Sequence, residues 1–119
     1  MRVEVVEIPI KFPSLNDYAK ALRKHYLRGA DMKREVQADT CVFIKRIKKF
    51  DKPVFLKFHW VEPNRKRDLD NIASSKKFVL DALVNQDILE DDGPDYVIGF
   101  QDTFEYGDDY KLVLTIEER

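Results

Sequence analysis

The run VFLKFHWV at residues 54–61 alternates large apolar side chains with other residues along its whole length. Val54, Leu56, Phe58 and Trp60 would share one face of a strand, because successive side chains of a strand point to opposite sides. A face this apolar must be covered, and helices of the same domain are the natural cover for one sheet. The run therefore predicts a sheet with helices packed against it.

Three further segments are predicted as strands. Residues 2–10 alternate well enough to place Val3, Val5 and Ile8 on one face. Two late runs have the same character, and we expect them to pair as a hairpin. These runs are residues 95–106 and 109–118, with the turn at Gly107 and Asp108.

Apolar residues at helical spacing predict two main helices. The predicted bounds are Asp31, as N-cap, to about Lys49, and Leu69 to about Val84. A weaker helix is expected over residues 17–27, ended by Gly29. The element order is then β-α-β-α-β-β, which predicts an α+β fold with a single mixed sheet of about four strands and two main helices.

The composition predicts a single soluble domain over residues 1–119. No apolar run approaches the roughly 20 residues that span a bilayer, so we expect no membrane association. The start of the chain lacks a signal peptide, and Cys41 is the only cysteine, which together favour the cytoplasm.

The small net charge hides a strong asymmetry along the chain. Residues 1–77 carry 19 Lys and Arg against 10 Asp and Glu, whereas residues 78–119 carry 2 against 12. Either the protein has a basic surface and an acidic one, or the fold interleaves the two parts and their fields cancel.

The stretch RKRDLD at residues 65–70 sets three cations directly beside two carboxylates. The cations could simply neutralise Asp68 and Asp70. The alternative is a site that holds metal cations and a polyanion together. Asp in the first turn of a helix is also favoured by the helix dipole alone, so the spacing by itself leaves both interpretations open.

Two more features bear on a metal site. On a helix starting near Leu69, the side chains of Asp70, Ser74, Lys77 and Asp81 would form one polar face. A second acidic cluster follows at residues 90–92, before a Gly-Pro break. Carboxylates gathered in one cavity need cations, and magnesium or manganese suits carboxylate oxygen.

Other site classes are not supported. A calcium loop aligned on Gly93 would need acids at Ile88 and Gly99, and zinc would find only one cysteine and two separated histidines, His25 and His59. No Walker, GxGxxG or GxSxG motif is present.

Several motifs together resemble the RusA family of Holliday-junction resolvases, which are small endodeoxyribonucleases of phages and prophages. They are IPIKFPSLNDY at residues 8–18, RDLDN at 67–71, KKFVLDAL at 76–83 and ILEDD at 88–92. The resemblance covers most of the chain, although residues 19–52 contribute little. It implies a homodimer that binds four-way junctions and cuts them symmetrically with Mg²⁺, for which Mn²⁺ would substitute.

The resemblance also implies roles for individual residues. Asp68, Asp70 and Asp92 would bind metal and catalyse cleavage, with Asp91 as the fallback for Asp92. The family has a functional lysine soon after DxDN, but the segment here is about three residues longer. Counting forward reaches Ser74, whereas counting back from DAL reaches Lys77, which we favour over Lys76.

The predicted function is metal-dependent cleavage of branched DNA by paired phosphodiester hydrolysis. Phosphate and DNA contacts are predicted for Arg65, Lys66, Arg67, Asn71, Lys76 and Lys77. The alternatives are a non-catalytic module that binds branched DNA with the same fold, and a structural domain whose acids only cap and solvate. The mild pI of about 6.1 is a departure from the family pattern, and it argues against strong non-specific affinity for DNA.

Overall fold

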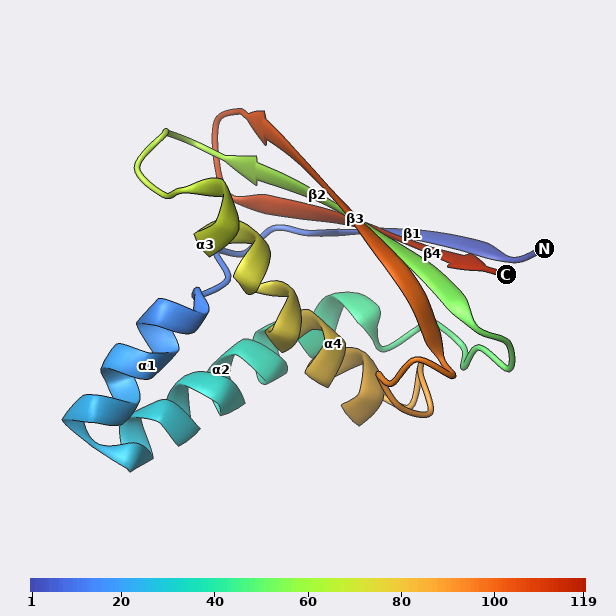
Figure 1. Ribbon diagram of the computed structural model, residues 1–119, viewed down its shortest axis with the longest axis horizontal. Helices are drawn as coiled ribbons and strands as arrows, with labels where there is room; N and C mark the ends of the chain where they lie inside the picture. Colours follow the sequence, from blue (N-terminus) through green and yellow to red (C-terminus); the bar gives the residue numbers. More distant parts are fainter.

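The computed structural model describes residues 1–119 and is built around one four-stranded sheet (Figure 1). The strand order is β1-β4-β2-β3, with β2 and β3 parallel and the other pairs antiparallel. The predicted α+β fold with a single mixed sheet is confirmed. In chain order the elements are β1 (Val3–Ile8), α1 (Leu15–Lys24), α2 (Tyr26–Ile44), β2 (Val54–Glu62), α3 (Leu69–Ser74), α4 (Lys76–Asn85), β3 (Val97–Tyr106) and β4 (Lys111–Glu118).

The helices lie on one side of the sheet and leave the other side open (Figure 1). The core forms where the sheet meets α4. The alternate residues Val54, Leu56, Phe58 and Trp60 of β2 are buried, as their period of two predicted. The largest helix side chain in this core is Phe78 of α4, which is 2% exposed. Burial of such side chains typically stabilises a fold by about 1.5–3 kcal/mol each.

The predicted face of the first strand is wrong. Val3 and Val5 are exposed, at 46% and 63%, whereas Ile8 is fully buried. Ile8 is separated from Val3 by an odd number of positions, so a regular strand must place the two on opposite faces. The core side of β1 is formed by its even-numbered residues.

The first two helices do not begin and end as expected. Gly29 does not end a helix but lies inside α2, and Asp31 is not its N-cap. His25 is the break: it is extended, and its Nδ1 accepts a hydrogen bond from the backbone N–H of Leu27. A Cβ at Gly29 would overlap the side chain of Leu22, so glycine permits the close approach of α1 and α2.

The single helix expected from Leu69 to Val84 is divided at Ser75 into α3 and α4. The backbone N–H of Ser75 donates to the carbonyl of Ile72, and that of Phe78 donates to the carbonyl of Ser75. These three-residue steps tighten the turn locally. The Ser75 hydroxyl donates to the carbonyl of Pro13 at 2.8 Å, which ties the break to the chain after β1.

The expected hairpin between the last two strands is also wrong. β2 lies between β3 and β4, so the turn at Gly107 connects strands that do not pair. The backbone N–H of Gly107 donates to the carbonyl of Glu62 at 2.9 Å, where the chain passes the end of β2. β3 is an edge strand of the sheet and runs parallel to β2.

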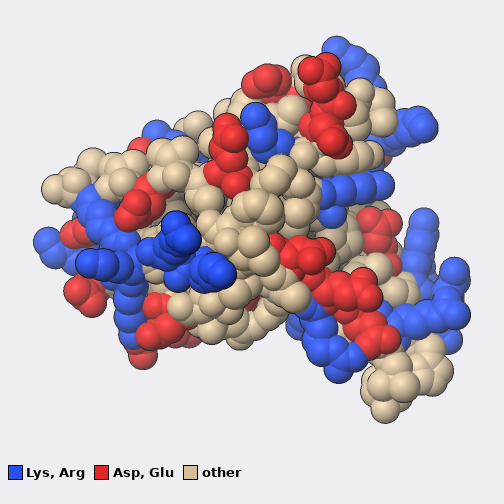
Figure 2. All heavy atoms as spheres, turned by 180° about the vertical axis from the view of Figure 1, so that it is seen from behind, with Lys and Arg blue, Asp and Glu red and all other residues tan.

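The fold interleaves the basic and acidic parts of the chain. Figure 2 shows Lys and Arg mixed with Asp and Glu over the face it presents. Several ion pairs join a cation from residues 1–77 to an acid from residues 78–119. They include Lys33–Asp81, Lys49–Glu90, Lys52–Glu118, Lys57–Glu117, Lys76–Asp102 and Lys77–Asp92. None of the helices combines the length and the apolar character that crossing a bilayer requires.

Candidate active site

Asp68 and Asp70 stand at the start of α3, directly after the loop that leaves β2. Asp68 is the N-cap residue, yet its carboxylate makes no capping hydrogen bond. Asp70 Oδ1 accepts from the backbone N–H of Asn71 at 2.9 Å. Both side chains are exposed, and neither belongs to any of the protein's salt bridges. The two carboxylates are therefore free to accept an external cation.

The three neighbouring cations do not neutralise these carboxylates. The Arg65 guanidinium lies over the ring of Tyr106, 4.2 Å from its centroid, and Lys66 is exposed. Arg67 turns inward and pairs with Glu62, with Nη2 2.7 Å from Oε2. Mutual neutralisation of cations and carboxylates therefore does not explain the RKRDLD stretch.

The second acidic cluster lies beside α4. Asp92 Oδ2 is 3.4 Å from Lys77 Nζ, and Asp81 Oδ1 is 3.0 Å from the same nitrogen. Asp91 is exposed, and its Oδ1 accepts from the backbone N–H of Asp92. These acids line an open pocket of about 400 Å³ together with Lys33 and Lys77.

The environment of Lys77 favours its charged form. The hydrogen bond to Asp81 is the main reason that the pKa of Lys77 is raised above its ordinary value of 10.5, and partial burial opposes this only in part. The charge and hydrogen bond of Asp92 add to the effect. The ammonium group stays protonated at any pH at which a nuclease works.

The two candidate lysines point to different neighbours, because successive residues of a helix are separated by about 100°. Lys76 Nζ lies 2.6 Å from Asp102 Oδ2 on β3, and its side chain is only 20% exposed. Trp60 Nε1 donates to the other oxygen of Asp102 at 2.9 Å. Lys77, in contrast, is 54% exposed beside Asp92.

Two other predicted polar residues are engaged within the chain. The Ser74 hydroxyl accepts from the backbone N–H of Leu15 at 3.1 Å and donates to the carbonyl of Asn71 at 2.7 Å. Asn71 Oδ1 accepts from Asn16 Nδ2 at 2.8 Å. Both contacts hold α3 against the turn that follows β1.

The sequence profile of the family described as Endodeoxyribonuclease RusA matches residues 11–117. The chain belongs to the RusA family. The resemblance suggested by its motifs is thereby confirmed over nearly the whole length. A comparison with curated proteins gives no match.

Holliday-junction resolution by RusA proteins implies a divalent ion. This RusA chain offers some, but not all, of the carboxylate ligands expected for such an ion. Magnesium is often held by one or two carboxylates together with substrate phosphates. Asp68 and Asp70 provide two such carboxylates, exposed and without a cation. No three His, Cys, Asp or Glu side chains lie close enough together to hold a metal. Asp92 is therefore not grouped with them as a third ligand.

Sequence reasoning missed two acids that shape this part of the RusA domain, Glu62 and Asp102. Glu62 is 4% exposed, and it continues the buried face of β2 two positions beyond Trp60. The period of two could have placed it there. Asp102 pairs in register with Phe58, so its position depended on the parallel pairing of β2 and β3, which no local pattern indicates.

Proposed function

We propose that this RusA protein is a Mg²⁺-dependent endonuclease that resolves Holliday junctions and related branched DNA by paired phosphodiester hydrolysis. The observation that carries the proposal is the family match over residues 11–117, which includes every residue assigned to the site. The unpaired carboxylates of Asp68 and Asp70 support it, because exposed acids without cations suit a hard divalent ion. With Cys41 as a free thiol, the cytoplasm is the proposed compartment.

Asp68 and Asp70 are the proposed metal-binding residues of the free chain, and Asp92, with Asp91 as the fallback, is proposed to join them only when DNA and a second copy are bound, because it is not grouped with them in the single chain. Magnesium, or manganese in its place, would activate water and stabilise the leaving 3′ oxygen. Lys77 stabilises charge that develops on the phosphate oxygens, since its ammonium is held beside Asp92 and stays protonated. Arg65 and Lys66, both exposed, contact neighbouring DNA phosphates.

A homodimer fits this activity. A four-way junction needs two nicks, and two copies related by a two-fold axis would present two sites with the same symmetry. Each copy contributes one set of acids at the start of α3 and one loop of exposed cations before it.

A non-catalytic module that binds branched DNA is the second candidate. Two observations favour it: Ser74 stands at the forward-counted position of the family lysine, with its hydroxyl engaged by Leu15, and three acids are not grouped. Such a module would bind a junction and leave it intact.

A nicking assay on a synthetic four-way junction tests the two candidates. We expect paired nicks on opposing strands in Mg²⁺ and none in EDTA, and we expect Mg²⁺ to raise the melting temperature through mass action. Junction binding without nicks, at any Mg²⁺ or Mn²⁺ concentration, would favour the non-catalytic module. Neither binding nor nicking would contradict both.

Replacing Arg65 and Lys66 together by glutamine should weaken junction binding and reduce its salt dependence. If each contacts one phosphate, the slope of log affinity against log salt should fall by about 1.8, or roughly 0.9 for each phosphate. The measurement is a salt titration of junction affinity in EDTA. Lys45→Gln with Arg46→Gln is the matched control, because it removes the same charge from the exposed end of α2. Equal slopes for the two double variants would exclude the loop from the interface.

A further inference from the structure

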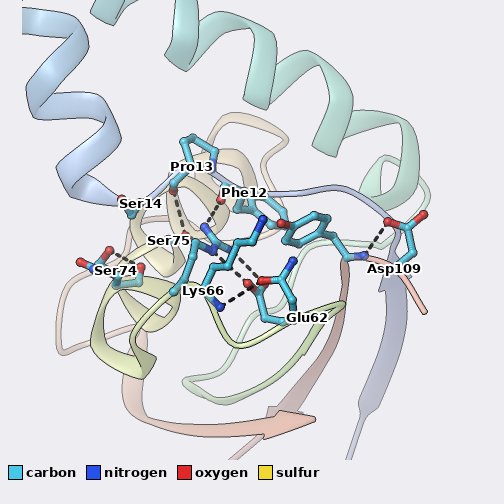
Figure 3. Close-up of polar contacts among 12 residues, drawn as sticks. Phe12, Pro13, Ser14, Glu62, Lys66, Ser74, Ser75 and Asp109 are labelled. Carbon is cyan, nitrogen blue, oxygen red and sulfur yellow. Dashed lines mark hydrogen bonds and ion pairs between the residues drawn. The ribbon is translucent and has the colours of Figure 1, made fainter. Parts of the chain in front are cut away.

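Arg67 and Glu62 form the most enclosed ion pair in the protein. Their side chains are 16% and 5% exposed. Arg67 Nε donates to Glu62 Oε1 at 2.9 Å and Nη2 donates to Oε2 at 2.7 Å, which is the two-point geometry that only a guanidinium provides. Nη1 donates to the carbonyl of Phe12 at 2.9 Å. Figure 3 shows Glu62 and Phe12 facing each other across these contacts.

This cluster joins three separate parts of the chain. Glu62 is the last residue of β2, Phe12 belongs to the segment after β1, and Arg67 directly precedes Asp68. The side chains of Glu62 and Arg67 are both largely enclosed, so they do not point from the loop at residues 63–67 into solvent. Because Arg67 directly precedes Asp68, contacts that fix the Arg67 side chain also restrict the backbone where α3 begins.

A second group of contacts fixes the other end of the same region. The segment after β1 is bound to α3 and to Ser75 by three hydrogen bonds besides that of Arg67, and Figure 3 shows the one that joins Ser75 to Pro13. They are Leu15 N to Ser74 Oγ at 3.1 Å, Asn16 Nδ2 to Asn71 Oδ1 at 2.8 Å, and Ser75 Oγ to the Pro13 carbonyl at 2.8 Å. The acids at positions 68 and 70 thus lie between two anchored points.

We propose that Arg67 is a positioning residue, which through Glu62 and the Phe12 carbonyl holds Asp68 and Asp70 in place and does not itself bind DNA. The inference rests on the proposed nuclease function for its kinetic consequence. The name Glu62–Arg67 strut is used for this pair.

Two physical arguments support the strut. A carboxylate as buried as that of Glu62 is stable only while a cation and hydrogen bonds compensate it, so Arg67 is not free to leave for a phosphate. The pKa of Arg67 agrees: burial would lower it, but the hydrogen bond and charge of Glu62 raise it overall. Arg65 differs from Arg67 both in burial and in its partner, since it is exposed and its guanidinium lies over the ring of Tyr106.

The test compares Arg67→Lys and Glu62→Gln with wild type, at a temperature at which all are folded. Lysine keeps the charge that a phosphate needs but loses the two-point contact, and glutamine keeps the shape of Glu62 without its charge. Both variants should cut a junction roughly 10- to 100-fold more slowly under single-turnover conditions. Their junction affinity in EDTA and its salt slope should remain those of wild type.

A direct phosphate contact predicts a different pattern. Arg67→Lys would then cut at nearly the wild-type rate, and Arg67→Gln would lower the salt slope by about 0.9. Glu62→Gln would leave cleavage unchanged, because a buried carboxylate does not face the DNA. Either result would overturn the strut.

A third variant keeps the test valid if the single variants fail to fold. A structural measurement keeps it valid if the proposed nuclease function is wrong. Glu62→Met with Arg67→Met replaces the pair by apolar side chains of similar length, which proteins commonly tolerate. Its loss of cleavage should equal that of Glu62→Gln alone. Amide hydrogen exchange at Ile72, whose N–H donates to the carbonyl of Asp68, and in the rest of α3 should accelerate in every strut variant of the free protein. Lys52→Gln, which removes an exposed pair with Glu118 at the far end of β2, is the control and should show no such change.

The exchange measurement needs neither DNA nor activity. A wild-type protein that does not nick junctions would refute the proposed function, and faster exchange in the variants would still support the strut. Unchanged exchange in all three variants would refute the strut even if the wild type is an active nuclease.

Discussion

Replacing Asp70 by asparagine is expected to lower junction cleavage roughly 10⁴-fold, the scale on which enzymes lose activity when a catalytic carboxylate is removed. Asp70 is exposed and belongs to no salt bridge, so its negative charge has no structural partner to lose. The single-turnover rate on a four-way junction in Mg²⁺ is the measurement. Junction affinity in EDTA should be unchanged, because binding depends on the cations of the preceding loop.

The same variant allows a readout that does not depend on cleavage. Mg²⁺ should raise the melting temperature of the wild type and have a smaller effect on Asp70→Asn. Asp51→Asn makes the same chemical change in an exposed loop at the opposite end of β2 and should behave as wild type. A cleavage rate for Asp70→Asn close to that of the control would contradict the assignment of Asp70 to the site.

Replacing Lys77 by methionine is expected to slow cleavage by roughly 10²-fold or more, which is typical for the loss of one group that stabilises developing charge. Its ammonium lies beside Asp92 and remains protonated because Asp81 raises its pKa. The effect should therefore appear in the single-turnover rate at every pH between about 6 and 9. The stability of the fold should change little, since the side chain is more than half exposed.

Lys76→Met is the natural counterpart, because it removes the neighbouring lysine. Lys76 is paired with Asp102 and largely enclosed, so its loss should destabilise the fold by about 1.5–3 kcal/mol. Denaturant unfolding would measure this change. If Lys76→Met slows cleavage by more than Lys77→Met while remaining folded, Lys76 is the functional lysine and our assignment is wrong.

The turn after β1 has a clear structural use in this chain. It resembles the Pro-Ser-x-Asn turn of the RusA family, and its backbone and side chains receive and donate the hydrogen bonds that hold α3. Ser14 also caps α1, with its hydroxyl accepting from Asp17 N and the Asp17 carboxylate accepting from Ser14 N. A short segment thus begins one helix and anchors another.

Local patterns determined much of this protein. The alternation at residues 54–61 predicted β2 and its buried face, and the RDLDN and ILEDD motifs indicated the RusA family. Such patterns succeed because they depend only on the geometry of one strand or helix and on residues close in the sequence. They also placed Asp68 and Asp70 correctly at the beginning of a helix.

Only the tertiary structure decided how these segments meet. The strand order, the division of the helix at Ser75, the partner of Arg67 and the different surroundings of Lys76 and Lys77 were all set by distant contacts. Arg67 meets Phe12 across 55 positions, and Lys76 meets Asp102 across 26. Buried charges must find compensating partners wherever the fold brings them, and helical or strand periodicity carries no information about residues so far away.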